Sequence, residues 1–147
     1  MKPETISVIL PIHKIPKHFT QVRKALFTST TPLEIIYVID KKLKEKIKQE
    51  NAYEKILFET NRGRGYMIQK GAQQAQNDII VILHADTLLP PKWDETIIHA
   101  MSNKQVIGGA FSLSFINQNT YLSLGIMVIN LLFNITGVLS GDLSLIH

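Results

Sequence analysis

The sequence of 147 residues contains no cysteine. This absence excludes a disulfide framework, a thiolate metal site and a thiol nucleophile, and it agrees with a reducing cytosol. The chain also shows no interleaving of aromatic and basic residues of the kind that single-strand RNA binders use. We therefore expect no nucleic-acid partner.

Several catalytic motifs are missing as well. The sequence has neither the G-x-x-x-x-G-K of a P-loop nor a G-x-G-x-x-G dinucleotide fingerprint. A nucleophile elbow and a Ser/His/Asp order are absent, so hydrolase chemistry has no support. The stretch "PIHKIPKHF" (11–19) contains no glycine, whereas a nucleotidyltransferase would carry a glycine-rich loop there.

Charge is unevenly distributed. The net charge is +4 and every lysine and arginine lies at or before Lys104, whereas no charged side chain occurs from Gln105 to Gly141. The basic part is suited to a nucleotide phosphate or an anionic membrane surface. By its length the chain is a single domain over 1–147, which we divide into a nucleotide half (1–104) and an uncharged acceptor-side or association segment (105–147).

The apolar segment 121–139 approaches the ~20 residues that a membrane span requires. Its polar residues Ser123, Asn130, Asn134 and Thr136 make it a poor lone span. We expect a helix that packs on the sheet, on a second copy in a homodimer, or on a membrane surface. Because "MKPETISVIL" predicts a first strand rather than a signal peptide, the expected location is cytoplasmic, with peripheral contact at the inner face of the membrane as an option.

Short aliphatic runs alternate with segments of helical periodicity. This alternation predicts an α/β fold, a three-layer αβα sandwich with a mostly parallel central sheet covered on both faces. Strands are expected at 5–12, 33–40, 55–60, 78–86 and 106–116, and helices at 17–29, 41–50, 65–76 and 91–102.

Ligands of such sheets bind outside the carboxyl ends of the strands. That rule places Pro11, Asp40, Thr60-Asn61 and the His84–Asp86 stretch along one edge. In "VILHADTLLPP" (81–91), Asp86 offers a carboxylate for Mg²⁺ or Mn²⁺, and His84 could ligate the same metal or hydrogen-bond a phosphate. The alternative is a polar core histidine and an aspartate that caps a turn.

Two further segments of this edge also have two interpretations. Asp40 could contact a ribose hydroxyl or a base edge, or could simply cap the helix expected from Lys41. The loop "TNRGRGYMIQKGA" (60–72) places Arg62, Gly63 and Arg64 before a helix, which suits a phosphate but also fits an ordinary glycine-rich loop with solvated arginines.

Taken together, these motifs resemble the family-2 glycosyltransferases of the GT-A fold, which is Rossmann-like. The bacterial "transferase 2" branch carries R-G-R before a small-residue helix, then L-H-A-D-T-x-L-P-P, then G-G-x-F. This chain has "RGRGYMIQKGA", "LHADTLLPPKW" and "GGAFSLSF" in the same order.

The resemblance implies a nucleotide-diphosphate sugar donor, UDP- or GDP-linked, and a divalent cation, Mg²⁺ or Mn²⁺. Pro11 and Asp40 would line the nucleoside pocket, and Arg62, Gly63 and Arg64 would lie beside the donor. The His84-Ala85-Asp86 stretch stands at the family's D-x-D position, which assigns Asp86, with His84, to the metal and the diphosphate.

The sequence also departs from the family pattern. The P-x-x-N-E stretch is here "PIHKIPK", and D-G-G-S-x-D-G-T is here "DKKLKEKI". The acidic catalytic base of a later E-D motif has no counterpart, because Asp142 in "GDLSLIH" matches the preceding Gly-Asp. The catalytic residue is therefore unassigned, and the chain could be a truncated piece, a degenerate member, or one that activates its acceptor elsewhere.

The sequence thus predicts a glycosyltransferase-like domain that transfers a sugar to an unknown acceptor with the help of a metal. The alternative is a non-catalytic nucleotide-binding or assembly domain on the same scaffold. Both predict binding of a nucleotide with metal, and they differ in turnover of the donor.

Overall fold

The structure is a computed structural model that describes residues 5–44, 46–60, 63–111 and 143–146. The expectations for the segment 121–139, for Arg62 and for Asp142 lie outside these residues, as do residues 112–116 of the strand expected at 106–116.

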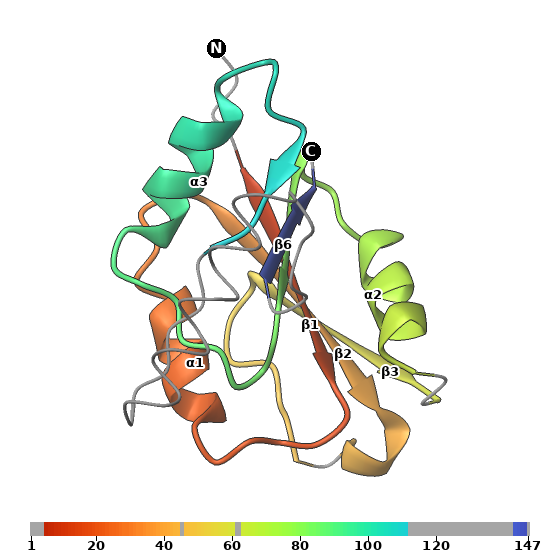
Figure 1. The fold of residues 1–147 in the computed structure, drawn as a ribbon. Helices are drawn as coiled ribbons and strands as arrows, with labels where there is room; N and C mark the ends of the chain where they lie inside the picture. The colour runs from red at the N-terminus through yellow and green to blue at the C-terminus, as the bar shows by residue number, and fades with distance from the viewer. Residues whose placement is uncertain (1–4, 45, 61–62, 112–142, 147) are drawn as a thin grey trace, which may run out of the picture.

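The described strands form a mixed sheet in the order β3-β2-β1-β4-β6-β5 (Figure 1). The strands β3, β2, β1 and β4 are parallel to one another, whereas β6 runs antiparallel to both β4 and β5. The expected mostly parallel sheet is therefore confirmed. The bounds are β1 Ile6–Ile12, β2 Leu33–Asp40, β3 Glu54–Glu59, β4 Ile79–Leu83, β5 Gly108–Gly109 and β6 Leu143–Ile146.

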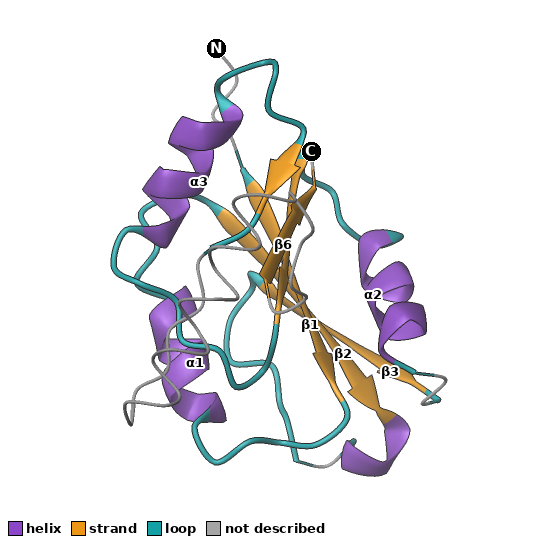
Figure 2. Ribbon diagram, viewed as in Figure 1, coloured by secondary structure: helices purple, strands orange, loops and turns teal. Residues whose placement is uncertain are grey.

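Helices cover both faces of the sheet (Figure 2). Helices α1 (Phe19–Leu26) and α3 (Trp93–Met101) lie on one face and α2 (Arg64–Ala72) on the other. Alternate residues of β1 separate the two cores: Val8 belongs to the cluster under α1 and α3, and Ile9 to the cluster under α2. The three-layer sandwich expected from the sequence is confirmed.

Helix α2 approaches the sheet closely at Gly71. A Cβ atom at this position would lie 2.4 Å from the Cγ2 of Ile9 and 3.2 Å from the Cγ2 of Val38. Only a residue without a side chain allows this distance between helix and sheet, since both neighbours are β-branched and buried.

The prediction of a helix at 41–50 is wrong. One 3₁₀ turn, η1 (Lys41–Leu43), follows Asp40, and the chain then continues without helix to β3 in its described part. Tertiary contacts explain the difference, because Ile47 is buried in the core and the carbonyl of Lys48 accepts a hydrogen bond from Arg23. Strand β6 was not expected from the sequence, and within the described residues 106–111 of the strand expected at 106–116 the structure has the two residues of β5.

None of the helices in the described part of the chain has both the length and the apolar character needed to cross a membrane.

Candidate functional site at the carboxyl edge of the sheet

The parallel strands bring the predicted site residues to one edge. Ile12 at the end of β1 pairs with Ile39, and Asp40 at the end of β2 pairs with Glu59, the last residue of β3. Pro11 is buried inside β1 opposite Val38, so its ring forms part of the support beneath the edge. The order of elements thus juxtaposes the strand ends that the sequence placed together.

Asp40 is a capping residue in this structure. Its side chain is almost fully buried, and its Oδ1 accepts a hydrogen bond from the backbone N–H of Lys42 at 3.0 Å. This bond starts η1, in agreement with the capping interpretation of Asp40, although the expected helix is reduced to a single turn.

His84 and Asp86 lie in a tight turn directly after β4. The amide of Thr87 donates to the carbonyl of His84 at 3.1 Å, which closes the turn and ends the strand at Leu83. The Nδ1 of His84 lies 3.7 Å from the Oδ1 of Asp86. The side chain of Asp86 is 67% exposed, whereas that of His84 is 27% exposed and its Nε2 is buried, so Asp86 is the member of the pair that is open to solvent. The turn therefore brings the two groups together, whereas the sequence predicted a strand that continued to residue 86.

This pair can serve as part of a site for a hard divalent cation. Mg²⁺ binds oxygen ligands at about 2.1 Å and usually keeps waters and substrate phosphates as its remaining ligands, so one or two protein groups are enough. Adjacent ligands of such an ion lie about 3 Å apart, and the His84 Nδ1 lies 3.7 Å from the Asp86 Oδ1. Within the described residues, no group of three or more His, Cys, Asp or Glu side chains gathers around one point.

Helix α2 begins at the same edge with a glycine-dependent turn. Gly63 has φ +96° and ψ 163°, a conformation that residues with a Cβ adopt only under strain. The helix starts at Arg64, which follows directly, and the amide of Met67 donates to the carbonyl of Gly63. The structure therefore places Gly63 and Arg64 at the amino end of a helix after β3, as the sequence predicted.

A buried charged cluster centred on Arg23 was not predicted from the sequence. Its guanidinium donates to both oxygens of Glu54 and to Glu50, each at 2.6 Å, and lies 5.5 Å from the ring centre of Tyr37. The Tyr37 hydroxyl also donates to Glu54. A signal was present, since Arg23 is four residues after Phe19 and three before Leu26 and so falls on the apolar stripe of α1.

Burial and hydrogen bonding have opposite effects on the pKa of Glu54 in this cluster. Burial alone would raise the pKa of Glu54, but the hydrogen bonds from Arg23, from the Glu50 amide and from Tyr37 hold it below its usual value. Burial and the hydrogen bond to Glu54 raise the pKa of Tyr37, so its hydroxyl stays protonated. The cluster fixes the connection between η1 and β3 against α1.

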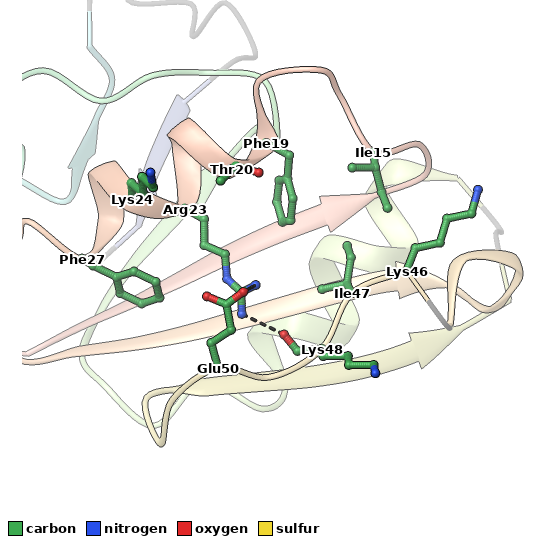
Figure 3. Close-up of a pocket in the computed structure, with 10 residues that line it drawn as sticks. All are labelled: Ile15, Phe19, Thr20, Arg23, Lys24, Phe27, Lys46, Ile47, Lys48 and Glu50. Atoms are coloured by element: carbon green, nitrogen blue, oxygen red, sulfur yellow. Dashed lines mark hydrogen bonds and ion pairs between the residues drawn. The ribbon is translucent and has the colours of Figure 1, made fainter.

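A cavity of about 440 Å³ lies beside this cluster, between α1 and residues 46–50 (Figure 3). Phe19, Ile47 and Phe27 contribute apolar surface, and the ion pair of Arg23 and Glu50 contributes polar surface. The cavity is lined by α1 and the η1–β3 connection, and neither His84 nor Asp86 borders it.

The fold and the edge together define an α/β domain of the GT-A type. The sequence pattern of the family described as "Glycosyl transferase family 2" matches residues 7–143. The chain belongs to this family. No curated protein sequence matches it significantly.

Solved structures support the fold. The mannosyltransferase PcManGT from Pyrobaculum calidifontis, in complex with GDP-Man and Mn²⁺, has a TM-score of 0.66 at 15% identity over 96% of this chain and 44% of its own. Residues 1–349 of S. aureus TarS give 0.63 at 18% identity over 78% of this chain and 37% of theirs.

The Mycobacterium tuberculosis glucosyl-3-phosphoglycerate synthase, solved with Mn²⁺, UDP and phosphoglyceric acid, gives a TM-score of 0.59 at 15% identity over 96% of this chain and 55% of its own. The chain thus spans between about a third and just over half of the length of these structures.

Proposed function

We propose that this chain binds a nucleotide-diphosphate sugar, UDP- or GDP-linked, and takes part in transfer of the sugar to an acceptor with the help of Mg²⁺ or Mn²⁺. The observation that carries the proposal is the turn after β4. It presents the exposed Asp86 carboxylate beside His84 at the carboxyl edge of a parallel sheet.

Asp86 is the proposed metal and diphosphate residue, with His84 as its neighbour on the same ion. A bound divalent cation would neutralise charge on the nucleoside diphosphate as it leaves. Arg62, Gly63 and Arg64 are proposed to lie beside the donor. The solved complexes with GDP-Man and Mn²⁺, and with Mn²⁺ and UDP, support this ligand class as properties of those proteins.

The proposed nucleoside pocket comprises Pro11 and Asp40. Asp40 contributes through the oxygen that does not cap η1, and Pro11 shapes the support beneath it. The residue that would accept the proton of the attacking hydroxyl is not assigned to any position of this chain.

A second candidate function is a nucleotide-binding or assembly domain without transfer activity. Two observations favour it: the Asp40 carboxylate is engaged in the cap of η1, and exposed lysines 41, 42 and 44 follow it. Turnover separates the candidates, because both bind the nucleotide and only the enzyme releases nucleoside diphosphate from the donor when an acceptor is present.

The test of the site is calorimetric titration of UDP and GDP into the protein with and without Mn²⁺. We expect Asp86→Asn to abolish the metal-dependent part of binding. The matched control is Asp78→Asn, which removes an exposed carboxylate at the opposite end of the same strand. Equal binding by wild type and Asp86→Asn would refute the site.

A further inference from the structure

Seven exposed lysines lie in the segments that follow β1 and β2. Two of them lie in the loop after β1 and five follow β2. Because Ile12 pairs with Ile39, the two segments leave the sheet side by side. Figure 1 shows the loop after β1 and the turn η1 at the foot of the molecule, from which the chain runs back toward β3. We call this surface the basic edge, and it consists of Lys14, Lys17, Lys41, Lys42, Lys44, Lys46 and Lys48.

In the described part of the chain, none of the seven lysines of the basic edge forms an ion pair with a carboxylate. Asp40 is buried and engaged with a backbone amide, and Glu50 is taken by Arg23. In the sequence, residues 41–48 hold five lysines and one glutamate.

The lysines are also held in position by the fold. The Arg23–Glu54 cluster fixes the η1–β3 connection, and Arg23 binds the carbonyl of Lys48 directly at 2.8 Å. In Figure 3 the side chains of Lys46 and Lys48 extend in the direction in which the strand arrows point, toward the basic edge. The buried Arg23–Glu54 cluster therefore helps to fix the segment that carries these lysines.

We propose that the basic edge is a docking surface for an anionic phospholipid membrane. Clusters of four to eight basic residues on one surface attract the negative lipids of the cytoplasmic leaflet. The exposed large apolar residues of the described chain are Phe27, Tyr53, Leu88 and Ile107, and none of them belongs to the segments 13–17 and 41–48. The contact is thus electrostatic and superficial, without insertion of side chains into the bilayer.

This composition favours a membrane over a nucleic acid. Single-stranded nucleic acids are held by basic grooves combined with aromatic side chains on which bases stack. The described segments of the basic edge contain no aromatic side chain, and the neighbouring Phe58 ring lies under the Lys44 ammonium at 5.8 Å. The proposal is independent of the proposed transfer function, since it requires only the lysines and the edge that presents them.

The experiment measures cosedimentation of the full chain with vesicles. Wild type is expected to bind vesicles that contain phosphatidylglycerol, to lose this binding at 0.5 M salt (roughly a 4 Å screening length), and to ignore pure phosphatidylcholine. The variant Lys41→Gln/Lys42→Gln/Lys44→Gln is expected to reduce the partition coefficient by about 100-fold, at ~5-fold per lysine. The control Lys24→Gln/Lys92→Gln/Lys104→Gln removes the same charge from exposed positions elsewhere and should bind nearly as wild type.

Four results would overturn the proposal. Failure of wild type to bind the anionic vesicles is the first, and an equal loss in both triple variants, which would indicate net charge alone, is the second. Unchanged binding in the basic-edge variant would show that another segment, such as 121–139, makes the membrane contact. Equal affinity for a DNA duplex at the same salt would indicate general polyanion binding. Titration of UDP with Mn²⁺ in the absence of vesicles reports separately on the proposed nucleotide site.

Discussion

The Arg23 guanidinium and the Glu54 carboxylate form a two-point ion pair beneath α1, with Nε and Nη2 each 2.6 Å from one carboxylate oxygen. Glu54 is 1% exposed, so its charge depends on this partner. The pair joins the first helix to the start of β3 across 31 residues of sequence. It is the main polar contact that holds the η1–β3 connection in place.

Arg23→Met is expected to destabilise the fold by about 3 kcal/mol, because it leaves a buried carboxylate without its cation. Lys24→Met, an exposed neighbour on the same helix, should change stability by less than about 0.5 kcal/mol. Adding Glu54→Gln to Arg23→Met should recover part of the loss, since the buried charge is then removed. Urea unfolding measures all three variants, and equal midpoints for Arg23→Met and Lys24→Met would contradict the prediction.

The lowered pKa of the buried Asp94 carboxyl leads us to expect a loss of stability in acid. The carboxylate is 2% exposed and accepts from the Ser29 hydroxyl at 2.7 Å and from the amides of Thr30 and Thr31. Burial alone would raise its pKa, but these hydrogen bonds hold the pKa well below its usual 3.8. A depressed pKa contributes stability that is present above the unfolded value and is lost as the pH falls below about 4.

We therefore expect Asp94→Asn to be less stable than wild type at pH 7 and to lose less on acidification from pH 4 to pH 2. Glu95→Gln, which alters the exposed neighbouring carboxylate, should follow the wild-type profile. Thermal unfolding across this pH range is the measurement. Parallel profiles for wild type and Asp94→Asn would show that the turn at Ser29–Thr31 does not depend on the charge.

Two glycines of α2 should respond to alanine in opposite directions. Gly71→Ala places a methyl group 2.4 Å from Ile9 and is expected to cost roughly 1–3 kcal/mol through overpacking. Gly65→Ala meets nothing within 4 Å in the same helix and should stabilise by about 0.4–1 kcal/mol. Chemical unfolding distinguishes them, and a stabilising Gly71→Ala would mean that the helix can move away from the sheet at no cost.

Gly63→Ala tests the turn that begins α2. The positive φ of Gly63 costs an L-residue about 1–3 kcal/mol, although a Cβ there would meet no neighbour. The expected result is a lower unfolding midpoint for Gly63→Ala, with Gly65→Ala as the sterically unhindered comparison. A neutral effect would indicate that the backbone relaxes to negative φ.

The sheet could be predicted because its central strands are continuous aliphatic runs between polar breaks, and their carboxyl ends follow from parallel order. The segment 41–50 was predicted as a helix because Leu43 and Ile47 have helical spacing. The sequence could not show that Arg23, distant along the chain, donates a hydrogen bond to the Lys48 carbonyl. Strand β6 was missed for a similar reason, since four residues carry little periodicity and their partner β4 lies some sixty positions earlier.

For the site, the sequence placed Pro11, Asp40, Gly63, Arg64, His84 and Asp86 at the carboxyl edge of the sheet, where the structure also has them, and their ligand roles remain predictions. The proximity of His84 to Asp86 arises from a turn whose closing bond to Thr87 is a backbone feature. The sequence had suggested that His84 and Asp86 could bind the same metal, but at the end of a strand expected at 78–86 and not in a turn. For Asp40 the sequence offered both a ligand contact and a cap, and the structure shows the cap, in which Oδ1 accepts from the amide of Lys42.

The antiparallel insertion of β6 between β4 and β5 has a consequence for synthesis on the ribosome. During translation, β1 to β4 can associate as soon as residue 83 emerges, but the free side of β4 stays open until Leu143–Ile146 arrives. An open strand edge invites pairing with another chain. The nascent protein therefore passes through an interval of about sixty residues in which a neighbouring polypeptide or a chaperone competes for the place that β6 finally takes.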